Sequence, residues 1–432
     1  MRTILLFGAG KSATVLIEYL LDNAATENWK VNVVDADIRL AISKVGNSLF
    51  GEALAFDIEN SELRNQHIQQ ADIVISLLPP ALHFIVAKNC VAAKKNLLTA
   101  SYIDENIRKL QSDIKKNKLL FLCEMGLDPG IDHMSAMKLI DEIQNQGGKI
   151  SSFKSHCGGL VAPESDDKPW HYKITWNTKS VVMAGKAGAT YKENDVPVNL
   201  SYENLFKNRK EIDIAGLGSY DWYPNRDSMS YAALYGLQQS STFIRTTLRH
   251  PNFIKGWNQI VQLKLTDELF LYDTKNKSLK SFYQDHFQKY ALDISTLDKT
   301  ILEQLQFLGL DDDETIIGSE SSSAADVMQL ILEKKLALLP QDKDMIVMKH
   351  ELEYKKEDKL FKRNSTLVVK GENNLHTAMA KTVGLPLGIA ARLILHGEIK
   401  LDGLHIPTHP KIYLPVLKEL VKYGIEFQEE GS

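Results

Sequence analysis

The sequence predicts an α/β protein whose N-terminal part is built on a parallel β-sheet, followed by an α+β domain that carries a small helical insertion. Three observations support this prediction. Short apolar runs alternate with helical patterns over the first 125 residues. Strand-like segments dominate after Gly130, and a mostly helical stretch covers about 258–339. Strands that alternate with helices need right-handed crossover connections, and such connections produce a parallel sheet.

The N-terminal elements follow from the apolar runs. The run 3–7 is typical of a strand buried on both faces, and a helix is expected to follow from about 11 to 24. Further strands are expected at 31–34, 53–56, 72–78, 97–99 and 119–123. Pro79-Pro80 marks the end of the strand at 72–78. Two more helices are expected at about 82–93 and 104–117.

After Gly130 the pattern changes to mixed elements. A helix is expected over 131–146, stopped by Gly147-Gly148. Strands are expected at 149–155, 171–176, 345–354 and 366–370, and helices at 279–290, 295–308, 324–338, 375–383 and 387–397. These elements predict a first domain over 1–127, to which about 395–432 returns. They predict a second domain over 128–257 and 340–394, interrupted by the helical insertion 258–339.

Composition limits the classes of protein to which the chain can belong. It has 51 basic and 55 acidic side chains, so the formal charge is −4, and the lack of a basic block argues against nucleic-acid binding. No apolar run approaches the ~20 residues that span a bilayer, so no membrane partner is expected. Cys90, Cys123 and Cys157 are too few and too scattered for a disulfide framework. Reduced thiols predict a cytoplasmic protein.

A G-x-G-x-x-A sequence, Gly8-Ala9-Gly10-Lys11-Ser12-Ala13, follows the first strand directly. In a Rossmann-type dinucleotide site the first glycine permits the tight turn, the second lets the pyrophosphate approach the backbone, and the last small residue permits close helix packing. A Walker A loop is excluded because Leu5 stands where that loop needs a glycine. The alternative interpretation is a simple strand–helix turn.

Other candidate coenzyme residues lie at the ends of the next strands. Asp35 ends the second strand, where a carboxylate accepts hydrogen bonds from the ribose 2′-hydroxyl of NAD and repels the 2′-phosphate of NADP. Asp57 ends the third strand and either faces the adenine or forms a turn. Ser76 and Leu77 end the fourth strand, on the side where the nicotinamide is expected.

Arginine is rare in this chain, yet Arg226, Arg245 and Arg249 fall within 24 residues. Arginine binds a carboxylate through two parallel hydrogen bonds, which lysine cannot do. The cluster therefore predicts a substrate with more than one carboxylate, with surface or interdomain ion pairing as the alternative.

Candidate proton-transfer groups lie near two strand ends. Asp128 belongs to a Gly-Leu-Asp-Pro-Gly turn after the sixth strand, where α/β sheets place active sites, and is either functional or purely a turn residue. Cys157 and its neighbour His156 are expected at the end of the strand 149–155, with an inert buried thiol as the alternative for Cys157. His405 and His409 have ligand-like spacing, but Pro407 and Pro410 argue against a metal site, and none is predicted.

Together these motifs resemble the saccharopine dehydrogenase family of the glutamate-forming type. The matching stretches are GLDPGIDH at 126–133, CGGL at 157–160 followed by APE at 162–164, YPNRDS at 223–228, TLR at 247–249 and AMAKTVG at 378–384. The resemblance implies a variant Rossmann domain, an α+β saccharopine-binding domain and a small helical domain. It also implies the interconversion of saccharopine with L-glutamate and L-2-aminoadipate 6-semialdehyde, using NAD(P).

By the same resemblance, saccharopine contacts fall on Ser101, Tyr102, Asp128, Arg226, Thr247, Leu248 and Arg249. Coenzyme contacts fall on Gly8, Gly10, Lys11, Ser12, Ala13, Asp35, Asp57, Ser76 and Leu77. Asp128, Tyr102 and Cys157 are the candidates for proton transfer, and the sequence does not rank them.

One departure concerns the coenzyme, because fungal members of the family use NADP and carry a basic residue near the end of the second strand. Asp35 stands there in this chain, so NAD is the predicted coenzyme and NADP the alternative. A homodimer is a further expectation. Two other function classes remain open: a carboxynorspermidine or homospermidine synthase, and a non-catalytic NAD-binding sensor. The first needs fewer carboxylate-binding arginines, and the second predicts a degraded substrate site.

Overall fold

The computed structural model describes residues 1–207 and 209–431, which form two compact units. Unit 1 comprises Met1–Lys149, Leu367–Gly371 and Leu375–Gln428, and unit 2 comprises Ile150–Thr366, Glu372–Asn374 and the residues from Glu429 on. These bounds differ from the boundaries expected near 127 and 395. The reason is packing, because helix α7 lies on α16 and helix α15 lies on α1, all within unit 1.

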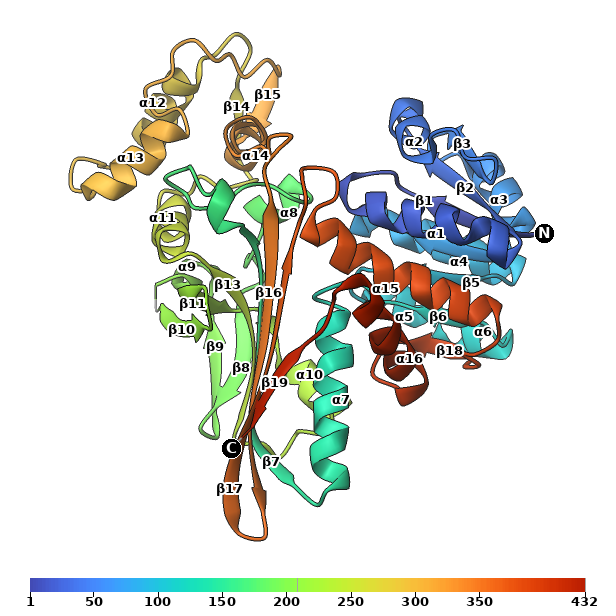
Figure 1. Ribbon diagram of the computed structural model, residues 1–432. Helices are drawn as coiled ribbons and strands as arrows, with labels where there is room; N and C mark the ends of the chain where they lie inside the picture. Colours follow the sequence, from blue (N-terminus) through green and yellow to red (C-terminus); the bar gives the residue numbers. More distant parts are fainter. Residues whose placement is uncertain (208, 432) are drawn as a thin grey trace. The chain divides into compact units, whose positions relative to one another are not determined.

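The sheet of unit 1 is parallel throughout, and its strands run in the order β18-β6-β5-β4-β1-β2-β3 (Figure 1). The first six strands therefore have the order 3-2-1-4-5-6 of dinucleotide-binding folds, which confirms the predicted α/β fold class. The strand bounds are β1 Arg2–Phe7, β2 Trp29–Asp35, β3 Gly51–Ala55, β4 Ile73–Ser76, β5 Asn96–Thr99, β6 Leu120–Leu122 and β18 Gly403–His405.

Helices cover this sheet, and the C-terminal helix α15 lies beside α1 (Figure 1). The helix bounds in unit 1 are η1 Lys11–Ala13, α1 Thr14–Glu27, α2 Ile38–Val45, α3 Ser61–Gln70, η2 Pro80–Leu82, α4 His83–Ala93, α5 Glu105–Lys109, α6 Gln111–Lys116, α7 Ile131–Asn145, α15 Ala378–Leu395, α16 Pro410–Leu420 and η4 Val421–Tyr423.

The prediction of two helices over 375–397 is wrong, because α15 is one continuous helix with Pro386 inside it. A proline within a helix costs about 3 kcal/mol. Close packing on α1 offsets this cost, since a Cβ at Gly384 would come within 2.9 Å of the Leu16 backbone nitrogen. The helix α15 has 18 residues and a mean hydropathy of 1.4, so by length and composition alone it could span a membrane. The sequence analysis expected no apolar run of that length. Since 72% of α15 is buried inside the protein, this is weak evidence for a span.

Unit 2 is built on a mixed sheet whose main path is β10-β11-β13-β7-β16-β17-β19, with β8, β9 and β12 joined at its side. A separate pair, β14 and β15, lies in the helical part. The bounds are β7 Lys149–Val161, β8 Ala189–Glu193, β9 Val196–Leu200, β10 Lys210–Ile214, β11 Gly218–Pro224, β12 Arg226–Asp227, β13 Thr242–Arg249, β14 Leu271–Asp273, β15 Ser321–Ser323, β16 Asp344–Lys356, β17 Lys359–Lys370 and β19 Gln428–Gly431.

Two strand predictions in this unit need correction. The strand expected to end at 155 continues to Val161, so Cys157 lies inside β7 rather than at its end. Gly158 makes this continuation fit, because a Cβ there would lie 2.7 Å from Leu248 Cβ on the neighbouring strand. The strand expected at 171–176 does not form. That segment is instead a buried loop, held by the Lys173 ammonium on Asp342 at 2.7 Å.

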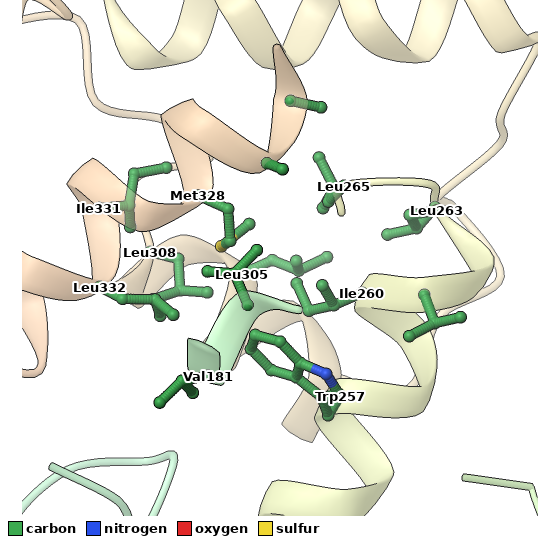
Figure 2. Packing of buried hydrophobic residues seen from close by; sticks show 14 of the residues in the cluster. Val181, Trp257, Ile260, Leu263, Leu265, Leu305, Leu308, Met328, Ile331 and Leu332 are labelled. Atoms are coloured by element: carbon green, nitrogen blue, oxygen red, sulfur yellow. The ribbon is translucent and has the colours of Figure 1, made fainter. Parts of the chain in front are cut away.

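The helices of unit 2 surround a second apolar core, in which α11, α13, α14 and α8 bring Trp257, Leu305, Met328 and Val181 together (Figure 2). This core joins the helical insertion to α8, α11 and the loop around Trp170 of the same unit. The bounds are η3 Pro163–Ser165, α8 Thr178–Val182, α9 Tyr202–Leu205, α10 Met229–Leu234, α11 Pro251–Gln262, α12 Leu279–Tyr290, α13 Lys299–Phe307 and α14 Ala324–Lys335.

Candidate functional site

The glycine-rich loop has the geometry that a dinucleotide needs. Gly8 has φ +101°, and a Cβ there would lie 2.9 Å from the Leu77 carbonyl oxygen, so only glycine fits between β1 and β4. Gly10 is different, because a Cβ there would meet no protein atom within 4 Å. This open space before η1 and α1 is where a pyrophosphate approaches the backbone. Lys11 is exposed beside it, Ser12 is half-buried and Ala13 is buried against the core.

The carboxylate of Asp35 lies at the end of β2 and holds the glycine-rich loop. Its Oδ2 accepts a hydrogen bond from the Ala9 backbone nitrogen at 2.8 Å, and its Oδ1 accepts one from the Asp37 backbone nitrogen at 3.0 Å. Each carboxylate oxygen keeps capacity for a second donor such as a ribose hydroxyl. The residues of unit 1 therefore fit a bound dinucleotide.

Arg39, a basic residue four positions after Asp35, already has a partner. Arg39 Nε and Nη2 lie 2.9 and 2.7 Å from the two oxygens of Asp37, and this pair lowers the pKa of Asp37. Asp57 is exposed, and its Oδ1 accepts a hydrogen bond from the Glu59 backbone nitrogen at 2.9 Å. This contact is that of a turn-forming aspartate, the alternative that the sequence left open.

Ser76 and Ser101 lie at the ends of the adjacent parallel strands β4 and β5, and one histidine joins them. His83 Nδ1 lies 2.9 Å from Ser76 Oγ, and His83 Nε2 lies 2.7 Å from Ser101 Oγ. The sequence analysis missed His83. Its place seven residues after Ser76, just behind Pro79-Pro80, was the available signal.

The loop that follows β6 brings together two of the predicted proton-transfer groups. The Tyr102 hydroxyl donates a hydrogen bond to Asp128 Oδ1 at 3.2 Å. Gly130 has φ +149°, and a Cβ there would overlap the Gly126 backbone, so the turn requires glycine. Asp128 therefore sits on a rigid turn with its side chain half-buried and bonded to a phenol.

A buried charged network lies directly behind this turn, and the sequence analysis assigned it no role. Glu124 Oε2 lies 2.9 Å from His133 Nε2, and Asp132 Oδ2 lies 3.5 Å from His133 Nδ1. Glu124 Oε1 also accepts a hydrogen bond from the Ile103 backbone nitrogen at 3.1 Å. All three side chains are almost fully buried, so the network fixes the loop between residues 124 and 133.

In unit 2, Arg249 is a buried cation at the end of β13. Its guanidinium carbon lies 5.2 Å from the ring centre of Tyr172 and 5.7 Å from that of Phe253, and Nη1 donates to the Leu248 carbonyl oxygen at 2.7 Å. Within residues 1–207 and 209–431, no acidic side chain pairs with Arg249, and its buried Nε has no acceptor. A buried guanidinium in this state is prepared for an external carboxylate.

The remaining predicted residues of unit 2 lie close by in the same sheet. Thr247 pairs in register with Cys157 of β7, so both side chains are on one face of the sheet. Leu248 is fully buried and faces the opposite side. Arg226 is exposed, with φ +50°, in the short strand β12, whereas Arg245 is buried with its guanidinium 4.4 Å from the Tyr231 ring centre.

The described part of the chain contains no group of three or more His, Cys, Asp or Glu side chains that could hold a metal ion. His405 Nε2 bonds to the Asp402 carbonyl oxygen at 2.9 Å, and His409 caps α16 by accepting from the Lys411 backbone nitrogen at 3.0 Å. Both histidines therefore have local structural contacts.

Comparison with known proteins identifies the family. Residues 4–122 match the model of the saccharopine dehydrogenase NADP binding domain, and residues 126–425 match that of the saccharopine dehydrogenase C-terminal domain. The chain belongs to the saccharopine dehydrogenase family. This finding confirms the resemblance that its motifs indicated.

Individual members agree with this membership. Saccharopine dehydrogenase (NADP+, L-glutamate-forming) of Saccharomyces cerevisiae is 33% identical over 99% of both chains. Mitochondrial alpha-aminoadipic semialdehyde synthase of Bos taurus is 33% identical over the whole of this chain and 48% of its own, so the chain spans about half the length of that relative. The apo structure of the S. cerevisiae saccharopine dehydrogenase covers 100% of both chains, with 31% identity and a TM-score of 0.89.

These comparisons support NAD(P) as the coenzyme class. The matched domain is described as NADP-binding, and the yeast relative is named an NADP+ enzyme. They give no support to the preference for NAD predicted from Asp35, and they lean toward NADP.

Proposed function

We propose that the protein is an oxidoreductase acting on a CH–NH bond, which interconverts saccharopine, NAD(P)+ and water with L-glutamate, L-2-aminoadipate 6-semialdehyde and NAD(P)H. The single observation that carries this proposal is the buried guanidinium of Arg249, which has no acidic partner among the described residues and an orphan Nε. A buried cation of this kind costs stability unless a ligand compensates it. Saccharopine carries three carboxylates and suits it.

The proposed substrate contacts begin with this arginine. Arg249 binds one carboxylate through its guanidinium fork, and Arg226 binds another. Tyr172 and Phe253 help to hold the Arg249 guanidinium in place through cation–π contacts. Thr247 and the backbone around Leu248 line the same strand end. Ser101 and Tyr102 of unit 1 are the other hydroxyl groups that the sequence resemblance assigns to saccharopine.

Proton handling is assigned to Asp128 and Tyr102. The nicotinamide coenzyme, when bound, supplies or accepts the hydride at the carbon next to the secondary amine. The carboxylate of Asp128 accepts a proton from the substrate amine or from the attacking water, and the Tyr102 hydroxyl orients that carboxylate through the bond of 3.2 Å. Cys157 Sγ is a weaker candidate, because a buried thiol is also a packing group.

For the coenzyme, the residues and the comparisons point in opposite directions. The Asp35 carboxylate at the end of β2 and the pairing of the nearby Arg39 with Asp37 favour NAD. The NADP-binding family description and the yeast relative favour NADP. We keep NAD as the residue-based prediction, and measuring kcat/KM with both coenzymes tests it.

The test of the proposed function is a substrate panel. Saccharopine, carboxyspermidine and other N-(carboxyalkyl) amino acids are incubated with NAD or NADP, and the reduced coenzyme is followed by its absorbance. Reaction with saccharopine alone supports the proposal. Reaction with carboxyspermidine would favour a polyamine-forming enzyme. Coenzyme binding without turnover of any member would favour a sensor.

Two further proposals concern the state of the protein in the cell. A cytoplasmic location is supported by the three cysteines, which are free and buried as expected in a reducing compartment. A homodimer stays the expectation stated from the sequence, and light scattering of the purified chain measures the oligomeric state directly.

A further inference from the structure

The imidazole of His83 joins two residues that the function assigns to different ligands. His83 begins α4, and its side chain is 2% exposed between the ends of β4 and β5. Ser76 is a predicted coenzyme contact and Ser101 a predicted substrate contact. Nδ1 of the ring lies 2.9 Å from Ser76 Oγ, and Nε2 lies 2.7 Å from Ser101 Oγ.

The ring is neutral under ordinary conditions. Burial lowers the pKa of His83 to about 4, and only the more distant carboxylate of Asp104 acts against this shift. A neutral imidazole has one N–H donor and one acceptor nitrogen. The two serine hydroxyls therefore cannot play the same part: one donates to the ring, and the other accepts from it.

This division controls what each serine can offer to a ligand. When Nδ1 carries the proton, it donates to Ser76 Oγ, and the Ser76 hydroxyl proton is available to a ligand. Ser101 then donates to Nε2 and offers only its lone pairs. In the other tautomer the two roles are exchanged. When a ligand accepts a hydrogen bond from one serine, the other serine donates its proton to the ring and can only accept a hydrogen bond from its own ligand.

We propose that His83 is a positioning residue that couples Ser76 to Ser101, so that a coenzyme bound at Ser76 and a substrate bound at Ser101 select the same tautomer of the ring. The identity of these ligands rests on the proposed function. The coupling itself rests on the two short hydrogen bonds of the buried ring, since the third contact, from Nε2 to Thr99 Oγ1, is longer at 3.5 Å.

Two variants separate the halves of this arrangement. The amide nitrogen of asparagine is as many bonds from Cα as Nδ1, and that of glutamine as many as Nε2. His83→Asn therefore keeps a partner for Ser76 and loses the one for Ser101, and His83→Gln does the reverse. Losing one such hydrogen bond weakens binding about three- to tenfold.

The measurements are the Kd of NADH and NADPH, by fluorescence titration, and the KM of saccharopine. We expect His83→Asn to raise KM about three- to tenfold with the coenzyme Kd near wild type, and His83→Gln to raise the coenzyme Kd by a similar factor with KM near wild type. We also expect saccharopine to change the Kd of the reduced coenzyme in the wild type and to change it less in both variants.

His396→Gln is the matched control, since His396 pairs with Glu27 at the end of α15 and touches neither serine. Equal changes in Kd and KM for both His83 variants, or no change in either, would overturn the proposal. A wild-type coenzyme Kd that is the same with and without saccharopine would also overturn the proposal. If the His83 variants do not fold, Ser76→Ala and Ser101→Ala must show the same separation of Kd from KM.

The coenzyme titrations need no turnover, so they distinguish the two proposals. A wild-type protein that binds coenzyme but does not oxidise saccharopine contradicts the proposed function. The difference in coenzyme Kd between His83→Asn and His83→Gln still decides the Ser76 half of the coupling.

Discussion

Replacing Arg249 by methionine tests the substrate site most directly. Methionine matches the arginine side chain as far as Nε, but it removes the guanidinium group with its charge and its N–H donors. Arg249 is 6% exposed; its Nη1 donates to the Leu248 carbonyl oxygen, and its buried Nε has no acceptor among the described residues. The pair that it would form with a substrate carboxylate is therefore largely desolvated.

The expected effect follows from that burial. Losing one partner of a desolvated charge pair costs about 2–5 kcal/mol, a fall in kcat/KM for saccharopine of about thirty- to several-thousand-fold. We expect the fall to appear mainly in KM. The Kd of NAD(P)H, measured by fluorescence titration, should stay near wild type, because the predicted coenzyme residues all belong to unit 1.

Stability distinguishes a ligand-binding arginine from a structural one. Arg249→Met removes a buried cation without an acidic partner and also loses cation–π contacts worth about 0.5–2 kcal/mol, so the free energy of unfolding should change by less than about 1 kcal/mol or rise. Arg392→Met is the matched control. Arg392 pairs with Glu419, so its loss should lower the free energy of unfolding by about 1–3 kcal/mol and leave KM unchanged.

Unchanged saccharopine kinetics in Arg249→Met would refute the assignment. A large loss of stability with a matching loss of coenzyme binding would also refute it, because that pattern belongs to a structural arginine.

Three further predictions concern proton transfer, coenzyme choice and pH. Asp128→Ala should lower kcat at least about tenfold with an unchanged melting temperature, since acid–base groups contribute about 10²–10⁴, and Cys157→Ser should be milder. Asp35→Ser should raise kcat/KM with NADP relative to NAD, measured at saturating saccharopine, because it removes a charge that repels the 2′-phosphate. Between pH 6.5 and 4 the His83 side chain is protonated in the unfolded state but stays neutral in the folded state. The free energy of unfolding therefore decreases by up to about 3 kcal/mol as the pH is lowered through this range. In denaturant titrations, His83→Gln should make this decrease smaller.

Each of these predictions has a result that contradicts it. A wild-type kcat and pH profile in Asp128→Ala would leave Asp128 as a turn residue only. A wild-type enzyme that favours NADP, as the comparisons lean, would show that Asp35 does not exclude the 2′-phosphate. An equally steep pH dependence in His83→Gln would mean that other groups cause the loss of stability.

The elements of unit 1 could be predicted because their signals are local. The strand 3–7 corresponds to β1, the helix 82–93 to α4, and the glycine-rich loop has the positive φ at Gly8 that its sequence requires. A strand buried on both faces is apolar wherever it lies in the sheet. The fingerprint loop is recognisable from its own residues, although Leu77 and Asp35 also contact it in the folded protein.

In two other segments the structure differs from the local prediction, because contacts with residues distant in sequence decide the conformation. The run 171–176 is buried and apolar enough for a strand, yet no strand pairs with it, and Lys173 is tied to Asp342 instead. The sequence predicted two helices, 375–383 and 387–397, where the structure has the single helix α15. The helix continues because packing on α1 needs a small residue at 384 and compensates for the proline.

For the candidate site, the sequence by itself determined which residue types follow which strands, that a glycine-rich loop follows the first strand, and that three arginines fall within 24 residues. These properties depend on order along the chain. Only the tertiary structure decided that Arg249 is buried without an acidic partner, and that His83 spans Ser76 and Ser101. The physical reason is that burial and hydrogen bonding depend on which side chains the fold brings within about 3 Å of each other, a distance that the linear sequence does not encode.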